Sequence, residues 1–303
     1  MDVCVIGCGP AGISGAICLE MAGYDVMIFE EKIIGGQMNT TPEIRNLAGV
    51  GDISGWELSA KMCEQLKNHN IRVLAEKVID VDIKNDTKKV ITQNGVYPTK
   101  AILVANGVIR RELGCDGEEK FKGRGVSYCA VCDGFFFKGK IVSVVGGGNT
   151  AFEDALYLSK ICKKVYLIHR REEFRGNKEM LERIKATPNI EIITCATVDR
   201  IVGSSVVEEI ILNVGDVQQT LKTDGVFVAI GLTGDNELFS KFLSLDDNGY
   251  IITDEMCKTD CEGVYAAGDT RNKKIRQIVT AMSDGAVASE GIIKYLSQKD
   301  NCT

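Results

Sequence analysis

The sequence is poor in histidine and in repeated cysteine motifs, which limits the metal sites that it can build. It has only two histidines, His69 and His169, and its twelve cysteines include a single CxxC pair, Cys129 and Cys132. A zinc site based on a CxxC usually needs a second CxxC or a pair of histidines. We therefore predict no metal site.

An excess of positive charge and long apolar runs are also lacking. The net charge is −6, which argues against a general binder of nucleic acids or anionic membranes. No apolar run approaches the roughly 18 residues that a transmembrane helix needs. The first residues, Met-Asp-Val-Cys-Val-Ile-Gly, lack the positively charged region of a signal peptide. These absences favour a cytoplasmic protein with no nucleic-acid or membrane partner.

The composition is that of a globular protein and not of a small disulfide-rich scaffold. With 303 residues, of which 45% are hydrophobic, the chain can build two domains with proper cores. Secreted disulfide scaffolds are much shorter. We interpret four cysteines in apolar or helical stretches as small buried residues and expect the one beside the carboxyl terminus to be mobile. The four are Cys4, Cys18, Cys162 and Cys195, and the terminal one is Cys302.

The amino-terminal segment carries a dinucleotide-binding motif in its proper context. A strand at residues 2–6 leads into Gly7-Cys8-Gly9-Pro10-Ala11-Gly12 and a helix to about Ala22, and a second strand at residues 25–29 ends at Glu30. The first glycine permits a tight turn, the second lets the backbone approach a pyrophosphate, and the third lets the helix pack on the strand. Glu30 is placed to accept hydrogen bonds from ribose hydroxyl groups. The pattern predicts a βαβ unit for an adenine dinucleotide without a 2′-phosphate, such as FAD.

A polar loop with two adjacent glycines follows, Gly35-Gly36-Gln37 and onward to Pro42, and it is compatible with close approach of a ligand. We then expect a helix over residues 56–68 and alternating strands through residues 71–104. The apolar strand Ala101 to Ala105 ends at Asn106-Gly107.

The same pattern returns in the second half of the chain. A strand at residues 140–145 leads into Gly146-Gly147-Gly148-Asn149-Thr150-Ala151, and a helix and a strand at residues 164–168 follow. Where the first unit has the acidic residue Glu30, this unit has His169-Arg170-Arg171, and Arg175 follows shortly after. Guanidinium groups bind a 2′-phosphate, whereas a carboxylate repels it, so the segment favours NADP. The alternative, a solvated basic turn, explains the charges but not their position after this strand. An apolar strand at residues 226–230 closes this unit as residues 101–105 close the first.

Between the two units lies Cys129-Ala130-Val131-Cys132-Asp133-Gly134. Two thiols at this spacing can form a readily exchanged disulfide, and one of them often has a lowered pKa. Asp133 is placed to manage protons. The alternatives are half of a zinc site or two small apolar residues. The flanking motifs favour redox chemistry, because a flavin can mediate between a nicotinamide, which donates hydride, and a disulfide, which accepts two electrons.

Together these residues resemble the low-molecular-weight thioredoxin reductases from one end of the chain to the other. The matching segments are Gly7–Gly12, Gly35–Gln37, Cys129–Phe136, Gly146–Ala151, His169–Arg175, Gly268-Asp269 and Arg276-Gln277. The resemblance implies an α/β fold of two Rossmann-like nucleotide-binding domains, each with a parallel central sheet, in which the NADPH domain is inserted into the FAD domain. We place the FAD domain at residues 1–113 and 245–303 and the NADPH domain at 114–244.

The resemblance also implies roles for individual residues. Cys132 would face the isoalloxazine ring, Cys129 would attack the disulfide of thioredoxin, and Asp133 would be the general acid–base group. For the FAD site it implies Gly7, Gly9, Pro10, Ala11, Gly12, Glu30, Gly35, Gly36, Gln37, Asn46, Ala105, Gly107, Gly268, Asp269, Arg276, Gln277 and Ile278. For the NADPH site it implies Gly146, Gly148, Asn149, Thr150, His169, Arg170, Arg171 and Arg175, and for thioredoxin docking Arg124, Phe135 and Phe136. A homodimer is implied as well.

Three departures from the family pattern lie outside the redox motif. Asn106 stands where threonine is common, Asn46-Leu47-Ala48-Gly49 replaces Asn-aromatic-Pro-Gly, and Gly234 stands where proline is usual.

The predicted activity is that of a thioredoxin-disulfide reductase that passes electrons from NADPH through FAD and the cysteine pair to thioredoxin. One alternative is a ferredoxin-driven flavin thioredoxin reductase of the same fold, against which the intact second glycine motif and basic segment argue. The other is a flavin-bearing redox sensor, which a complete CxxC-Asp and two cofactor sites make unnecessary.

Overall fold

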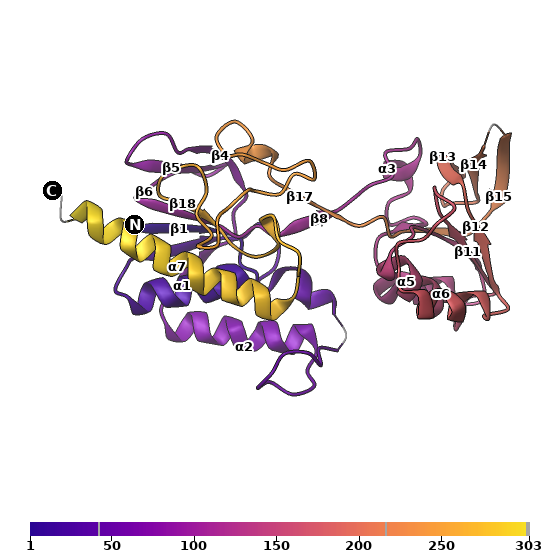
Figure 1. Ribbon diagram of the computed structural model, residues 1–303, viewed down its shortest axis with the longest axis horizontal. Helices are drawn as coiled ribbons and strands as arrows, with labels where there is room; N and C mark the ends of the chain where they lie inside the picture. Colours follow the sequence, from indigo (N-terminus) through magenta and orange to yellow (C-terminus); the bar gives the residue numbers. More distant parts are fainter. Residues whose placement is uncertain (42, 216, 301–303) are drawn as a thin grey trace. The chain divides into compact units, whose positions relative to one another are not determined.

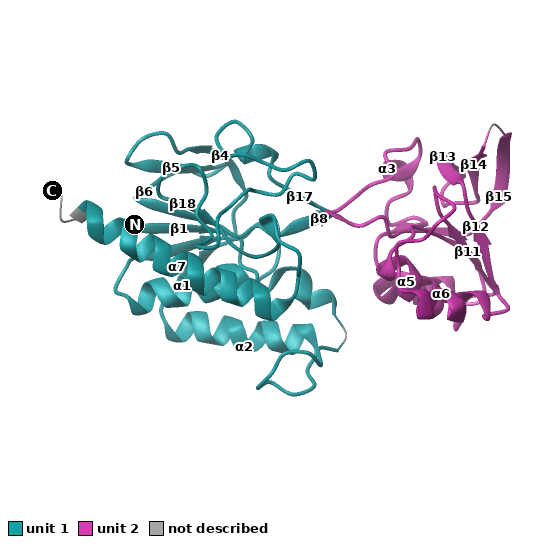
Figure 2. Cartoon of the chain, in the orientation of Figure 1, with its two compact units in different colours: residues 1–109, 233–303 teal, residues 110–232 magenta. Residues whose placement is uncertain are grey.

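The computed structural model describes residues 1–41, 43–215 and 217–300. The chain forms two compact units, residues 1–109 with 233–303 and residues 110–232 (Figure 2). It passes between them along β8 (Val108–Arg110) and β17 (Leu232–Gly234), which pair as a two-stranded sheet. The stretch after β17 belongs to the first unit because Phe239 and Leu243 are buried in its core. The borders predicted from the sequence lay further along the chain, after residues 113 and 244.

The first unit is built on a parallel sheet of five strands. In spatial order these are β18 (Val264–Ala266), β7 (Ala101–Val104), β1 (Val3–Ile6), β2 (Val26–Phe29) and β3 (Arg72–Leu74). The first four are apolar and buried along their whole length, as expected for a parallel sheet covered on both faces. The strands predicted at residues 2–6, 25–29 and 101–105 are confirmed to within one residue.

Helices cover one face of this sheet and a small antiparallel sheet covers the other (Figure 1). The helices are α1 (Pro10–Met21), α2 (Gly55–Asn68) and α7 (Ile278–Asp300), and the strands are β4 (Val78–Asp82), β5 (Lys88–Thr92) and β6 (Val96–Thr99). Close packing of α1 and α7 depends on Gly285, since a Cβ there would lie 2.2 Å from the carbonyl oxygen of Ala11. Helix α2 starts at a capping box formed by Ser54 and Glu57.

The second unit repeats this plan. Its parallel strands, in spatial order, are β12 (Ile190–Ile193), β11 (Lys164–Ile168), β10 (Ile141–Val145), β16 (Gly225–Val228) and β9 (Val126–Ser127). Helices α5 (Asn149–Ser159) and α6 (Lys178–Lys185) pack on one face. The antiparallel strands β13 (Ala196–Val202), β14 (Glu209–Val214) and β15 (Val217–Lys222) pack on the other.

Both units therefore have three layers and a parallel central sheet, and the predicted fold class is confirmed. The remaining short elements are η1 (Gly36–Thr40), α3 (Glu118–Phe121), α4 (Ala130–Asp133), η2 (Gly134–Phe137), η3 (Glu237–Phe239) and η4 (Gly268–Thr270). No helix in the described ranges is long and apolar enough to span a bilayer. The same ranges contain no group of three or more His, Cys, Asp or Glu side chains placed to hold a metal ion.

The expectation about the cysteines holds in part. Cys4 and Cys162 are buried, and Cys18 is half-buried on α1. The prediction is wrong for Cys195, which is exposed and adopts a left-handed backbone conformation, with φ of 55°, in the turn between β12 and β13. Cys302 and Pro42 lie outside the described residues.

Candidate active site

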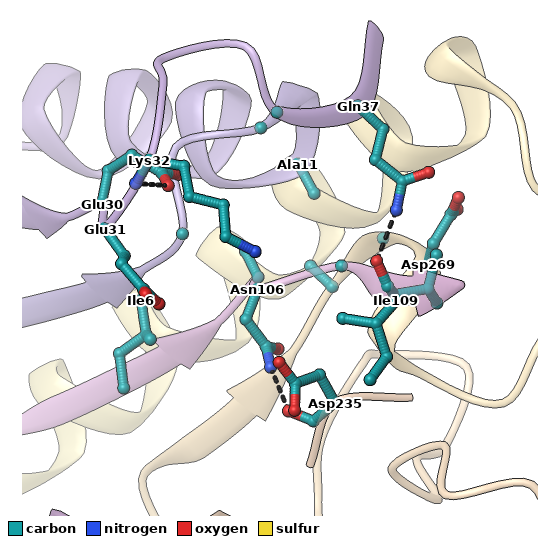
Figure 3. A pocket seen from close by; sticks show the side chains of 18 of the residues that line it. Ile6, Ala11, Glu30, Glu31, Lys32, Gln37, Asn106, Ile109, Asp235 and Asp269 are labelled. Carbon is teal, nitrogen blue, oxygen red and sulfur yellow. Dashed lines mark hydrogen bonds between the residues drawn. The ribbon is translucent and has the colours of Figure 1, made fainter. Parts of the chain in front are cut away.

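A cavity of about 1180 Å³ lies in the first unit at the carboxyl ends of β1, β2, β7 and β18 (Figure 3). Because these strands are parallel, the residues that follow them meet at one edge of the sheet. Pockets for drug-sized ligands usually have about 300–1,000 Å³, so the cavity has room for a longer ligand such as a dinucleotide. Of the residues predicted for the FAD site, it is lined by Gly7, Gly9, Pro10, Ala11, Glu30, Gly36, Gln37, Ala105, Gly107, Gly268, Asp269, Arg276, Gln277 and Ile278.

Glycine occurs at the three positions of the first motif for different physical reasons. Gly7 has φ of 103°, and Gly12 comes so close to it that a Cβ would lie 2.0 Å from the Gly7 carbonyl oxygen. Gly9, the N-cap of α1, has extended backbone, and a Cβ there would meet no protein atom within 4 Å. The fold of the chain therefore explains Gly7 and Gly12, whereas Gly9 leaves open space at the helix N-terminus, where a phosphate group can approach the backbone.

Backbone amides hold the carboxylate of Glu30 at the edge of the cavity. The N–H of Cys8 donates to Glu30 Oε2 at 2.8 Å, and the N–H of Lys32 donates to Oε1 at 2.9 Å (Figure 3). Each carboxylate oxygen can accept more than one hydrogen bond. Glu30 is thus oriented by the backbone and can still accept from ribose hydroxyl groups.

Asp269 has an unsatisfied oxygen at the cavity. Its Oδ1 is buried and has no hydrogen-bond partner among the described residues, and burial raises the pKa of this carboxyl group. A buried polar atom without a partner costs about 1–3 kcal/mol. The position therefore suits a ligand that donates a hydrogen bond here, as the hydroxyl groups of a ribityl chain do.

Asp284 on α7 supports the turn that carries Asp269. Its carboxylate accepts from the N–H of Gly268 at 3.1 Å and forms ion pairs with Arg271 at 3.1 Å and Lys273 at 2.7 Å. All three side chains are nearly buried, so these pairs are only weakly screened by solvent.

Gln37 and Arg276 complete the rim of the cavity. The side-chain amide of Gln37 donates to the carbonyl of Val108 (Figure 3). The Arg276 guanidinium lies 3.9 Å from the centre of the Tyr250 ring, and its buried Nε has no partner in the part of the chain that the structure describes.

In the second unit Cys129 and Cys132 form a disulfide. Cys129 is the N-cap of the short helix α4, and the N–H of Cys132 donates to its Sγ at 3.2 Å. A hydrogen bond of this kind stabilises a thiolate at Cys129 when the disulfide is open. Cys132 is the more exposed of the two residues, so exposure alone would favour Cys132 as the attacking thiol and hydrogen bonding favours Cys129.

Ser127 links Asp133 to this pair. The Ser127 hydroxyl donates to Asp133 Oδ2 at 2.6 Å, and the N–H of Cys129 donates to the same hydroxyl oxygen at 3.1 Å. The carboxylate is therefore held next to the disulfide, where it can take up or release a proton.

Exposed aromatic side chains follow the disulfide. Phe135 and Phe136 are each 71% exposed, whereas the next residue, Phe137, packs against Phe227 in the core. Arg124 is also exposed, and its guanidinium donates to the carbonyl of Lys120 at 2.6 Å. Large apolar side chains left in solvent beside a reactive group are typical of a docking surface.

The second glycine motif repeats the geometry of the first. A Cβ at Gly146 would lie 2.3 Å from the carbonyl oxygen of Ala229, as one at Gly7 would lie 2.4 Å from that of Ala105. Gly148 is the N-cap of α5 and, like Gly9, has nothing within 4 Å of a Cβ. Next to it Asn149 and Thr150 are exposed, and Asn149 Oδ1 accepts from the N–H of Asn177 at 2.7 Å.

Three arginines and one histidine follow β11, and they differ in exposure. Arg170, Arg171 and Arg175 are exposed, and none of them forms an ion pair with another described residue. His169 is buried: it stacks on Phe174 at 4.8 Å and leaves no room for a Cβ at Gly147. Burial, and then the neighbouring arginines, lower its pKa. His169 thus shapes the glycine turn as a neutral ring, and the arginines supply the charge.

The pyridine nucleotide-disulphide oxidoreductase profile matches residues 1–285. The chain is 38% identical to the thioredoxin reductase of Peptoclostridium acidaminophilum over 304 aligned residues, which cover 97% of this chain and 96% of that protein.

The chain belongs to the pyridine nucleotide-disulphide oxidoreductase family.

Solved structures of thioredoxin reductases are similar to the structure of this oxidoreductase. The crystal structure of Lactococcus lactis thioredoxin reductase has a TM-score of 0.89 at 36% identity and covers 98% of this chain and 99% of that one. A ferredoxin-flavin thioredoxin reductase from Clostridium acetobutylicum is also similar, with a TM-score of 0.56, 30% identity and 98% of each chain covered. The oxidoreductase is therefore a thioredoxin reductase-like flavoprotein disulfide reductase, and its family uses FAD and NAD(P)H.

Three residues predicted for the FAD site do not line the cavity of the oxidoreductase. Gly12 packs helix against strand, as described above. Gly35 has φ of 97°, and its N–H donates to the Cys8 carbonyl at 2.7 Å, so it shapes the loop beside the cavity. Asn46 is exposed in the loop before α2. The assignment of Asn46 to the FAD site stays a prediction.

Two features near the redox centres of the oxidoreductase were missed in the sequence. One is Asp284, an acid in an otherwise apolar part of α7. The other is Asp154, whose pKa is raised to about 6 by burial although Arg110 opposes the shift. Arg110 also interacts with Asp133. Leu158 lies one helical turn after Asp154 on the same face of α5. Leu158 packs against Gly134, the residue that follows Asp133. The sequence shows only adjacent Glu153 and Asp154, and helix packing decides that Asp154 is half-buried and Glu153 exposed.

Gly9 of the oxidoreductase offers a test of the cavity as a cofactor site. Gly9→Ala adds a methyl group where no protein atom lies, so the apoprotein should keep a free energy of unfolding within about 1 kcal/mol of the wild type. Its affinity for FAD should fall at least about tenfold, because the pyrophosphate needs the same space. Titration of apoprotein with FAD, followed by flavin fluorescence, measures this.

Gly12→Ala is the matched control for that variant. The added methyl group meets the Gly7 carbonyl oxygen, so we expect a loss of about 1–3 kcal/mol in unfolding free energy. Wild-type FAD affinity in Gly9→Ala would show that no ligand approaches this glycine.

Proposed function

We propose that the chain is an NADPH-dependent thioredoxin-disulfide reductase that carries FAD. The observation that supports this most directly is the Cys129–Cys132 disulfide, hydrogen-bonded through Ser127 to Asp133 and bordered by Phe135 and Phe136. A disulfide beside exposed aromatic side chains suits a protein substrate. A small-molecule disulfide substrate would need no such surface.

Three residues can carry out the exchange with thioredoxin. The Cys129 thiolate attacks one sulfur of the thioredoxin disulfide, a mixed disulfide forms, and the other thioredoxin sulfur leaves as a thiolate. The Cys132 thiolate then attacks Cys129 Sγ, so Cys129–Cys132 closes and thioredoxin leaves as a dithiol. Two electrons pass to thioredoxin with two protons, and Asp133 is placed to move a proton at the Cys132 sulfur.

The cavity of the first unit fits FAD by three observations on this chain. Open space lies at Gly9, the Glu30 carboxylate is held by backbone N–H groups at the end of β2, where a ribose would bind, and Asp269 Oδ1 has no donor among the described residues. Gln37 and Arg276 at the rim would hold the ring end. When bound, FAD would supply the two-electron link between a nicotinamide and the disulfide.

The exposed arginines of the second unit support NADPH as the electron donor. Arg170, Arg171 and Arg175 follow the strand next to the second glycine motif, where an NAD site would carry an acid. Free guanidinium groups can bind a 2′-phosphate by charge-assisted, bidentate hydrogen bonds. The carboxylates that would repel this phosphate are absent from positions 169–171.

A ferredoxin-driven reductase is the second candidate, because a ferredoxin-flavin thioredoxin reductase is among the similar structures. A protein that takes electrons from ferredoxin has no use for a 2′-phosphate site. The intact loop from Gly146 to Thr150 and the arginines beside it therefore favour NADPH.

The decisive experiment compares electron donors. The purified FAD-loaded protein receives oxidised thioredoxin with NADPH, NADH or reduced ferredoxin under anaerobic conditions, and new thioredoxin thiols are counted. We expect sustained reduction with NADPH and little with the other two donors. Reduction by ferredoxin alone would establish the second candidate, and a single stoichiometric event without turnover would indicate a redox sensor.

A further inference from the structure

Two turns of the second unit lie against each other beside the disulfide. The first, residues 134–140, follows α4, and the second, residues 160–163, follows α5. The N–H of Gly139 donates to the carbonyl of Ile161 at 2.9 Å, and the N–H of Lys163 donates to that of Lys140 at 2.8 Å. These backbone bonds hold together segments that are about twenty residues apart in the sequence.

The two turns carry a group of lysines that we call the lysine patch. Its members are Lys138, Lys140, Lys160 and Lys163, all of them exposed. Within residues 1–41, 43–215 and 217–300, none of these four ammonium groups forms an ion pair. Neither turn contains an aspartate or glutamate; the Asp224 carboxylate lies beside the first turn, where it accepts from the N–H of Ile141 at 2.8 Å, and it forms no ion pair with these lysines. Other lysines of the same unit do pair: Lys164 lies 2.6 Å from Glu191 and Lys185 lies 2.9 Å from Glu182.

The lysine patch is continuous with the apolar surface at the disulfide. Lys138 comes directly after the η2 residues, and its N–H donates to the carbonyl of Phe135 at 3.2 Å. A Cβ at Gly134 would lie 3.0 Å from both Tyr157 and Leu158, so the end of α5 that leads to Lys160 packs against the segment after Cys132. A protein that covers Phe135 and Phe136 therefore comes within reach of these lysines.

The lysine patch gathers four positive charges on a chain whose net charge is −6. Like charges on neighbouring turns repel one another, and the one aromatic contact among them is that of Lys140 Nζ, which lies 5.5 Å from the centre of the Phe137 ring in the part of the chain that the structure describes. An acidic partner would offset this repulsion. Charges at the rim of an interface also steer association and fix orientation more than they add affinity.

We propose that the lysine patch is part of the docking surface and selects a thioredoxin-like partner with carboxylates beside its disulfide. The inference rests on the proposed function and adds the chemical character of the partner. It places the apolar contact at Phe135 and Phe136 and the electrostatic contact at Lys138, Lys140, Lys160 and Lys163.

The test uses the FAD-loaded protein with two thioredoxins, one of negative and one of positive net charge. The variant Lys138→Glu/Lys163→Glu should lower kcat/KM for the acidic thioredoxin about tenfold or more at low salt, mainly through KM. Added NaCl should weaken the wild-type reaction and close most of this gap by about 0.5 M, where the Debye length is below about 5 Å. With the basic thioredoxin the same variant should match or exceed the wild type.

Two controls separate docking from folding and chemistry. Lys258→Glu/Lys294→Glu makes the same change of charge at exposed positions of the first unit and should leave kcat/KM within about twofold. Anaerobic NADPH should open Cys129–Cys132 in every protein, seen as two new thiols. The milder Lys138→Gln/Lys163→Gln should show a smaller loss in the same direction.

The possible results have distinct meanings. If the wild type reduces thioredoxin but the patch variant is unaffected, or loses activity equally with both thioredoxins and at all salt concentrations, the lysine patch does not select the partner. If the wild type opens its disulfide with NADPH but reduces no thioredoxin, the proposed function fails. Equal losses in the patch and control variants also overturn the patch assignment, because the effect then comes from net charge.

Discussion

Serine at either Cys129 or Cys132 should lower turnover with oxidised thioredoxin by about three orders of magnitude or more. Neither variant can form the disulfide that closes the catalytic cycle, and removal of one member of a nucleophilic pair commonly costs as much as removal of both. Steady-state NADPH oxidation in the presence of thioredoxin measures the loss. Cys195→Ser, which changes an exposed free cysteine of the same unit, should stay within about twofold of the wild type.

The two variants should differ in what they trap. If Cys129 attacks thioredoxin, the Cys132→Ser protein, once reduced, should accumulate a mixed disulfide with thioredoxin through Cys129. The Cys129→Ser protein should not, because the attacking sulfur is gone. Mass spectrometry under non-reducing conditions distinguishes them. A mixed disulfide in Cys129→Ser alone would exchange the roles and would mean that the greater exposure of Cys132 outweighs the hydrogen bond to Cys129.

The double variant Arg170→Ala/Arg171→Ala should raise the Kd for NADPH about 100-fold. Each charge-assisted hydrogen bond to the 2′-phosphate contributes about 1.5–3 kcal/mol, and the exposure of both guanidiniums places the expected value at the lower end. Two such bonds, about 3 kcal/mol in total, correspond to a factor of about 100. Affinity for NADH, which lacks this phosphate, should change less than about threefold.

Arg183→Ala provides the matched control, since Arg183 is an exposed arginine of the same unit on α6. It should leave both affinities unchanged. Titration with NADP⁺ and NAD⁺, the oxidised forms that bind without reducing the flavin, followed by the change in flavin fluorescence, gives the two dissociation constants. A double variant that keeps the wild-type preference for NADPH would place the 2′-phosphate away from these arginines.

Local motifs explain why much of the candidate site could be predicted. A turn with φ of 103° at Gly7, and the 2.0 Å approach of a Cβ at Gly12 to that turn, each restrict the residue type strongly. Such restrictions can be recognised in the six consecutive residues 7–12. The spacing of Cys129 and Cys132 is equally local. The parallel strands were recognisable because strands covered on both faces are apolar throughout.

Residues that act through distant neighbours could not be found in this way. Asp284 supports Gly268 from sixteen residues away, and only the packing of α7 on α1 brings them together. The partial burial of Asp154 on α5 likewise arises from tertiary packing, in which Leu158 of the same helix contacts Gly134. The grouping of the residues after β17 with the first unit has the same cause, because burial of Phe239 and Leu243 against β4 leaves no signal of its own in the sequence.

The family, the two repeated nucleotide-binding units, the redox cysteine pair and the residue types at both glycine motifs can be read from the amino-acid sequence, since each depends on residues close together in the chain. The tertiary structure shows which side chains are buried and which lack a hydrogen-bond or ion-pair partner among the described residues. Among the described residues, Asp269 Oδ1 has no donor, His169 is buried, and Lys138, Lys140, Lys160 and Lys163 lie on neighbouring turns without forming an ion pair. Burial and charge pairing depend on segments that the strand order brings together, and the local sequence pattern does not encode those distances.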